Sequence, residues 1–104
     1  MWCRSSLKPN TKVIAWVAGI FEGEGNCSSP GGTFNANVTQ KDPELLNILV
    51  AFFGGRIFLN QRGISKWYVS GPRAHGFMMT IYMFLTRRRQ IQYRTAMQQS
   101  TFGG

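Results

Sequence analysis

Two glutamates, Glu22 and Glu24, stand at the end of an apolar segment in a chain that has only 4 acidic residues. The segment from Val13 to Phe21 has the composition of a buried helix, and a glycine separates the two acids. A helix C-terminus carries partial negative charge, so carboxylates there are destabilising unless a cation offsets them. Hard divalent cations bind carboxylate and backbone carbonyl oxygens. The pair therefore predicts a divalent metal site at the end of this helix.

The chain as a whole is strongly basic. Its 104 residues contain 12 Lys and Arg against 4 Asp and Glu, which gives a net charge of +8. A domain of this charge favours nucleic acid, because neutralising phosphates releases their counterions. A membrane surface also attracts basic proteins. The length and the 43% of apolar residues predict one domain over residues 1–104.

Cysteine and histidine usage excludes several classes of site. Cys3 and Cys27 have neither metal-ligand spacing nor a disulfide framework, and the single histidine, His75, argues against zinc-finger and histidine-based nuclease chemistry. Lys8 and Lys12 before an apolar run resemble the start of a signal peptide, but no small-residue cleavage site follows. No apolar run reaches the roughly 18 residues that span a bilayer. We expect an intracellular protein with no membrane partner, in an organelle, a bacterium or the cytoplasm of a phage-infected host.

Capping and turn residues divide the chain into helices and hairpins. Asn10 or Thr11 can cap a first helix, Asp42 and Pro43 can begin a second, and glycine-rich turns separate the strands. The pattern predicts helices over about 11–22, 43–53 and 73–86, strands over 33–40, 56–60 and 64–70 with turns at 30–32 and 61–63, and a final helical segment that ends near 98. The order helix, hairpin, helix, hairpin, helix, helix predicts an α+β fold with helices on one face of an antiparallel sheet.

The predicted strands alternate between apolar and polar residues. Phe34, Ala36 and Val38 alternate with residues that should face outward, and no strand contains an acid. Such an outward face suits the DNA major groove, although an ordinary solvated sheet is the alternative. The residues that we expect at DNA are Ser28, Thr33, Asn35, Asn37, Thr39, Arg56, Phe58, Asn60, Arg62, Lys66 and Tyr68, together with Arg89.

Small residues form a stripe on the first helix. Ala15, Ala18 and Gly19 follow an i, i+3, i+4 spacing, which allows close approach of another backbone. The stripe fits two arrangements equally, a helix packed on its own sheet and a helix packed on a partner helix.

Three segments together resemble one family. Residues 17–25, V-A-G-I-F-E-G-E-G, resemble the LAGLIDADG motif of homing endonucleases in its glutamate form. N-V-T-Q-K at 37–41 is similar to the end of that family's second strand, and Phe84-Leu85, followed by basic residues and Gln90, is similar to the start of its closing helix. The resemblance implies an αββαββα core over about 11–98, with antiparallel hairpins that form a DNA-binding saddle.

The resemblance also implies roles for particular residues. Glu24 matches the family's metal ligand, with the Gly23 carbonyl beside it, and Gln40 matches a glutamine that orders water near the scissile phosphate. Arg87 or Arg88 stands where the family has a basic residue that stabilises phosphoryl charge, and the register leaves both open. One motif per chain implies a homodimer, with an interface at Ala15, Ala18, Gly19 and Glu22.

The function that the resemblance implies is a homodimeric, Mg²⁺-dependent homing endonuclease that cuts both strands of a roughly palindromic duplex site. Mg²⁺ would offset the repulsion between two copies of Glu24 and activate water for attack on a phosphodiester. A non-cleaving relative, such as an intron maturase or a DNA-binding regulator, stays open, because the first hairpin is short. A basic structural or membrane-surface protein is disfavoured by the patterned sheet.

Overall fold

The computed structural model describes residues 8–60 and 62–99. Its elements are α1 (Thr11–Glu24), β1 (Gly25–Ser28), the 3₁₀ turn η1 (Pro30–Gly32), β2 (Asn35–Gln40), α2 (Pro43–Phe53), β3 (Arg56–Leu59), β4 (Ser65–Ser70), α3 (Gly71–Ile81), the 3₁₀ turn η2 (Tyr82–Phe84) and α4 (Arg87–Gln98). This order confirms the predicted alternation of helices and hairpins.

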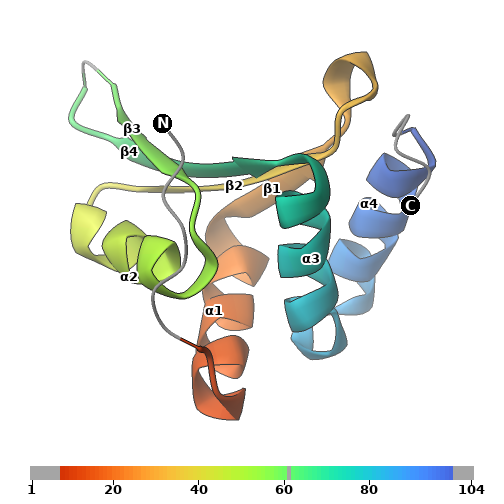
Figure 1. Cartoon of the computed structure of the whole chain (residues 1–104), viewed down its shortest axis with the longest axis horizontal. Coiled ribbons are helices and arrows are strands. Elements are labelled where there is room, and N and C mark those ends of the chain that lie inside the picture. The colour runs from red at the N-terminus through yellow and green to blue at the C-terminus, as the bar shows by residue number, and fades with distance from the viewer. Residues whose placement is uncertain (1–7, 61, 100–104) are drawn as a thin grey trace.

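The four strands form one antiparallel sheet in the order β1-β2-β4-β3. All four helices lie on the same side of it, as Figure 1 shows. At both sides of the molecule the hairpin ends of the sheet rise away from the helices (Figure 1). One face of the sheet is thus left uncovered by any helix of the described part of the chain, and the predicted α+β class is confirmed.

The core lies between the sheet and the helices. Trp67 of β4 is fully buried, and its ring meets the ring of Phe77 in α3 edge-on at 4.8 Å. The indole nitrogen of Trp67 donates a hydrogen bond of 2.8 Å to the carbonyl of Gly54, so its one polar atom is satisfied. A side chain at Gly55 would approach the Val69 side chain within 2.6 Å, and Gly55 has a φ of +100°, so only glycine fits there.

The predicted caps are present. Asn10 accepts a hydrogen bond of 3.0 Å from the Val13 amide at the start of α1, and Asp42 accepts one of 2.9 Å from the Glu44 amide at the start of α2. The end of α2 at Gly54 was also predicted.

Two helix ends differ from the prediction. The first helix continues past Glu22 to Glu24, and the chain becomes extended only at Gly25. The third helix stops at Ile81 instead of about Thr86, because the chain makes the η2 turn and then buries Leu85 in the core.

Two of the predicted features, the thiol of Cys3 and part of the turn at 61–63, lie outside the described residues. Cys27 is a free, buried thiol.

None of the helices in residues 8–60 and 62–99 is both long enough and apolar enough to span a bilayer.

Candidate nucleic-acid interface and metal site

The uncovered face of the sheet presents side chains from all four strands. The pairing register aligns Asn26, Asn37, Tyr68 and Arg56 in one row across β1, β2, β4 and β3. Residues directly opposite each other in antiparallel strands project to the same face. These four side chains therefore form a continuous polar and aromatic row on this face, which we call the outward face.

A second row on the outward face adds a cation and an aromatic ring. Thr39, Lys66 and Phe58 lie opposite one another on β2, β4 and β3. The guanidinium of Arg56 lies 4.9 Å from the centroid of the Phe58 ring, and Phe58 meets the Tyr68 ring edge-on at 6.3 Å. The cation–π contact holds the planar Arg56 fork over the Phe58 ring.

The predicted outward orientation is therefore confirmed for most of the strand residues, while their contact with DNA stays a prediction. Thr33 and Arg62 are also exposed, beside the strands. The residues confirmed on the outward face are Asn37, Thr39, Arg56, Phe58, Lys66 and Tyr68.

Asn35 is the exception among the strand residues. It was predicted to contact solvent and DNA, but it is buried, with 6% of its surface exposed. Ser28 and Ser70 flank Asn35 on the neighbouring strands, and the Ser28 hydroxyl donates a hydrogen bond of 3.4 Å to the side-chain Oδ1 of Asn35. The alternation of residues along β2 predicted correctly which face of the sheet Asn35 lies on, but it did not predict that the residue is buried.

The side chain of Asn60 is engaged in the turn between β3 and β4. Its Oδ1 accepts hydrogen bonds from the amides of Arg62 at 2.8 Å and Ile64 at 3.0 Å. This oxygen organises the turn, so any contact of Asn60 with DNA is left to the amide nitrogen.

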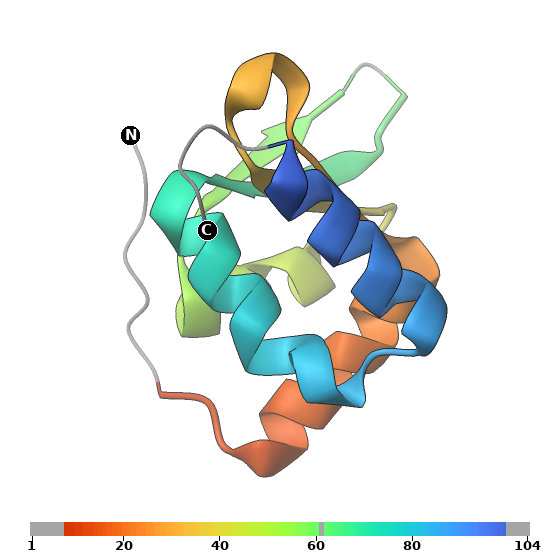
Figure 2. The ribbon, with the colours of Figure 1, turned by 90° about the vertical axis from the view of Figure 1, so that its right-hand side faces the viewer.

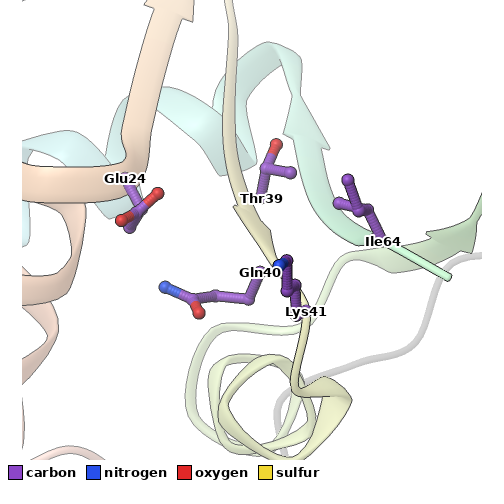
Figure 3. A pocket seen from close by; sticks show the side chains of 5 residues that line it. All are labelled: Glu24, Thr39, Gln40, Lys41 and Ile64. Atoms are coloured by element: carbon purple, nitrogen blue, oxygen red, sulfur yellow. The ribbon is translucent and has the colours of Figure 1, made fainter. Parts of the chain in front are cut away.

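A pocket opens where α1 ends beside β2. It has a volume of about 360 Å³ and is lined by Glu24, Thr39, Gln40, Lys41 and Ile64. Figure 3 shows the Gln40 side chain extending toward the side on which Glu24 lies. Gly25 pairs with Val38, so continuing the register backward by one residue brings Glu24 beside Thr39 of the outward face. The predicted metal ligand and the predicted water-ordering glutamine thus share one pocket.

Lys41 is a pocket residue that the sequence analysis did not assign. It directly follows Gln40 in the segment N-V-T-Q-K, which was the available signal. Lys41 is exposed, and it brings positive charge into the same pocket as the Glu24 carboxylate. Arg87 and Arg88, one of which was predicted to stabilise phosphoryl charge, do not line the pocket.

Glu22 connects the end of α1 to the start of α4. Its carboxylate accepts hydrogen bonds from the amide of Thr86 at 2.9 Å and from the hydroxyl of Thr86 at 2.8 Å. It also lies 3.6 Å from Arg88 and 3.9 Å from Arg89. Burial raises the pKa of Glu22, but the Thr86 hydrogen bonds and the two arginine charges outweigh it and hold this pKa below its ordinary value.

Glu22 therefore holds the end of α1 to the start of α4, and two arginines stand near its carboxylate, which does not line the pocket of Glu24. Its proposed place in a dimer interface stays a prediction, since the contacts that it makes here are within its own chain.

Arg89 does not lie where the sequence analysis placed it. It was predicted to contact DNA, but it is buried, with 8% of its surface exposed. Its Nε and Nη2 donate hydrogen bonds of 3.1 and 3.0 Å to the backbone carbonyl of Glu22. The guanidinium also lies 5.7 Å from the centroid of the Phe21 ring. Its charge is used at the C-terminus of α1, where unpaired carbonyls attract a cation.

One side of α1 exposes small residues. They are Ala15 and Gly19 of the small-residue stripe, together with Gly23, and a Cβ added at Gly19 or Gly23 would meet no atom within 4 Å. Ala18, which was predicted to belong to the dimer interface, is 1% exposed and packs in the core of its own chain. A helix turns 100° per residue, so Ala18 faces inward where Ala15 and Gly19 face outward.

The donor set at the pocket fits Mg²⁺ held jointly with a phosphate. Within residues 8–60 and 62–99, no three histidine, cysteine, aspartate or glutamate side chains cluster closely enough to enclose a metal ion. Mg²⁺ commonly uses one or two carboxylates, keeps several waters and takes substrate phosphate oxygens. Glu24 is an exposed carboxylate on a pocket that also contains a lysine, so it offers one protein ligand and leaves the other positions to water and phosphate.

Comparison with solved structures identifies the fold as that of homing endonucleases. Two structures of the homing endonuclease I-CvuI match this chain with a TM-score of 0.66 each, at 19% and 20% sequence identity. One holds the I-CreI target with 2 mM Mg and uncleaved DNA, and the other holds its own target with 2 mM Ca. The match covers 82% of this chain and 63% of the I-CvuI chain, so this chain spans less than two thirds of the length of that protein. The sequence matches no family model and no curated protein.

Proposed function

We propose that the chain is a Mg²⁺-dependent, site-specific DNA endonuclease of the LAGLIDADG type that acts as a homodimer. The observation that carries this proposal is the pocket that joins Glu24 at the end of α1 to Gln40 and Lys41 at the end of β2. This pocket adjoins the outward face of the sheet through Thr39, so DNA on that face would place a backbone phosphate near the Glu24 carboxylate.

Three of the pocket residues, Glu24, Gln40 and Lys41, would have roles in phosphodiester hydrolysis. Glu24 and the Gly23 carbonyl would hold Mg²⁺, which supplies a Lewis acid and lowers the pKa of bound water. Gln40 can orient a water toward the phosphorus atom by donating and accepting hydrogen bonds. Lys41 would stabilise negative charge that develops on the phosphate oxygens, in place of the arginines expected from the sequence. Such chemistry depends on position and charge, and needs no covalent nucleophile.

The outward face would supply recognition. The Arg56 fork can donate two parallel hydrogen bonds to guanine, and Asn37 can pair with adenine in the same way. Lys66 would bind a phosphate and hold the register on the duplex. The 12 basic and 4 acidic residues give the net positive charge that draws the chain to DNA.

A homodimer would make the site complete. One chain brings one Glu24, whereas cutting two strands needs one such pocket for each strand. The exposed small residues Ala15, Gly19 and Gly23 allow two α1 helices to pack closely about a twofold axis. The two outward faces would then form one saddle, and the preferred DNA site would be roughly palindromic.

A non-cleaving DNA-binding protein is the second candidate. The observation that favours it is the short first hairpin, whose β1 has 4 residues. A short hairpin shortens the reach along the groove and lowers the number of base contacts. Both candidates share the outward face, and they differ in whether Glu24 is needed.

A randomised duplex library separates the candidates. The purified protein is incubated with the library in Mg²⁺, and cut and bound molecules are sequenced separately. An endonuclease gives cut molecules with a site of twofold symmetry, whereas a binder gives enriched bound molecules and no cut ends. Cut ends that share no sequence would contradict site specificity.

A further inference from the structure

The start of α4 contacts the chain on both sides of Glu24. On the N-terminal side, Nε and Nη2 of Arg89 donate hydrogen bonds of 3.1 and 3.0 Å to the carbonyl of Glu22. On the C-terminal side, Nε2 of Gln92 donates a hydrogen bond of 2.8 Å to Oδ1 of Asn26. In Figure 2 the beginning of α4 lies beside the end of α1, in agreement with these contacts.

These two contacts are joined into one unit. Nη1 of Arg89 donates a hydrogen bond of 2.8 Å to Oε1 of Gln92, three residues later on the same face of α4. The Gln92 amide thus accepts from Arg89 and donates to Asn26. We call Arg89 and Gln92 together the α4 clamp.

The α4 clamp acts where the backbone changes from helix to strand. The last carbonyls of a helix lack partners within it. The Phe21 carbonyl accepts from the amide of Gly25, and the Glu22 carbonyl accepts from Arg89. Gly25 is already extended, and a side chain there would overlap the Phe21 ring. Glu24 is the last helical residue, so the position of this transition sets the direction of its side chain.

We propose that Arg89 and Gln92 are positioning residues, which hold the Glu22 carbonyl and the Asn26 side chain on the two sides of Glu24 and so keep its carboxylate directed into the pocket with Gln40. Neither residue lines that pocket, so both act through the residues that flank Glu24. The effect of this positioning on DNA cleavage rests on the proposed function, whereas the contacts of Arg89 and Gln92 beside Glu24 do not depend on it.

A role in stability alone does not account for the Gln92 contact. Gln92 is half-buried and its bond to Asn26 is a side-chain pair near solvent, and such bonds add little to stability. Asn26 also belongs to the first row of the outward face, opposite Asn37. The clamp therefore links the end of α1, the candidate metal ligand and the edge of the candidate DNA surface.

The test compares Gln92→Met with the matched control Gln98→Met on the exposed side of the same helix. Methionine preserves length and helix propensity but makes none of the hydrogen bonds. Hydrogen exchange is followed by NMR at the Gly25 amide and at the slowest amides of β4. We expect exchange at Gly25 to become about three- to tenfold faster in Gln92→Met alone, with the β4 amides unchanged, because only local opening is affected. Equal Gly25 exchange in both variants would overturn the proposal.

A second substitution removes the same bond from the strand side. Asn26→Ala should also speed exchange at Gly25, and it replaces Gln92→Met as the deciding variant if the latter does not fold. Equal exchange in Asn26→Ala and the wild type would then count against the clamp.

Cleavage provides the functional arm. Single-turnover cutting of a preferred duplex in Mg²⁺ should fall about ten- to a hundredfold in Gln92→Met, because small displacements of a reacting group are costly. Duplex affinity in Ca²⁺ should stay within about twofold. Unchanged cutting would refute positioning for catalysis. If the wild type cuts no duplex, the proposed function fails, while the exchange experiment still decides whether the clamp positions Glu24.

Discussion

Two glycine-to-leucine substitutions test the dimer through opposite effects on stability. Gly19 lies on the exposed side of α1, and Gly76 lies on the exposed side of α3. A Cβ added at either glycine meets no atom within 4 Å in the single chain. We therefore expect the single chain to accept Gly19→Leu and the control Gly76→Leu alike. They differ only if α1 packs against a second copy.

The expected magnitudes follow from helix propensity and packing. Replacing glycine in an exposed helix interior by a good helix former adds about 0.5–1 kcal/mol to the free energy of unfolding. Gly76→Leu should gain this amount, which raises the midpoint of thermal unfolding by a few degrees, about 4–8 °C for each kcal/mol. At a close helix–helix contact, extra side-chain volume costs about 1–3 kcal/mol. Gly19→Leu adds this volume where two α1 helices would meet, so the dimer dissociation constant should rise by about five- to 150-fold.

The measurement is sedimentation of each variant over a range of concentrations, with thermal unfolding alongside. The unfolding midpoint of a dimer rises with protein concentration, and this dependence should persist in Gly76→Leu and weaken in Gly19→Leu. If Gly19→Leu is stabilised as much as Gly76→Leu and associates like the wild type, then α1 does not form the dimer contact. A wild type that is monomeric both alone and with DNA would remove the premise.

Three further substitutions address recognition, charge and stability. If the Arg56 fork binds guanine, Arg56→Ala should weaken DNA binding by about 1–3 kcal/mol and relax the base preference at one symmetric pair of positions in the duplex library. An unchanged base preference would exclude Arg56 as a base contact. Lys41→Met should lower single-turnover cutting by about a hundredfold, with Arg88→Ala as the control that leaves it nearly unchanged, and the reverse order would restore the arginine assignment. Glu22→Gln should lower the free energy of unfolding at neutral pH by about 1 kcal/mol, because it weakens the hydrogen bonds from Thr86 and removes the charge beside exposed Arg88 and buried Arg89. The pKa of Glu22 is lowered in the folded state, so its ionised carboxylate stabilises the fold at pH values above its unfolded pKa of about 4.3, and this stabilisation is lost as the pH falls through the folded pKa. In denaturant unfolding, the free energies of unfolding of the wild type and Glu22→Gln should therefore converge in acid. A difference in this free energy that persists at low pH would assign the effect to lost hydrogen bonds.

The fold could be predicted from the sequence because its signals are local. The caps at Asn10 and Asp42, the glycine pair after α2 and the alternation in β2 each depend on a few neighbouring residues, and each was predicted with nearly the right bounds. Leu85 was assigned to a helix, but α3 ends at Ile81 and Leu85 is buried in the core; burial of this kind depends on tertiary packing, which no local pattern contains.

The candidate site was predicted less completely, for a related reason. Glu24 and Gln40 were found through a family pattern, and the structure brings both to one pocket. Arg89 was expected at the surface because an arginine run is usually solvated. It is buried because the end of α1 offers a carbonyl to its guanidinium, and this becomes apparent only when α4 is placed beside α1. Lys41 joins the pocket because β2 ends next to α1, which is also a tertiary relation.

We propose that Glu24 holds the Mg²⁺ ion on which DNA cleavage depends, and a comparison of the wild type with Glu24→Gln measures this dependence. The wild type and Glu24→Gln are mixed with a duplex from the library, and cutting is followed in single turnover over a range of Mg²⁺ concentrations, with binding measured separately in Ca²⁺. Glutamine preserves the shape of the side chain and removes its charge, so Glu24→Gln should bind the duplex as tightly as the wild type or more tightly, and should not cut it at any Mg²⁺ concentration. Cutting by Glu24→Gln at the rate of the wild type would contradict the assignment of the metal ligand and, with it, the account of the pocket.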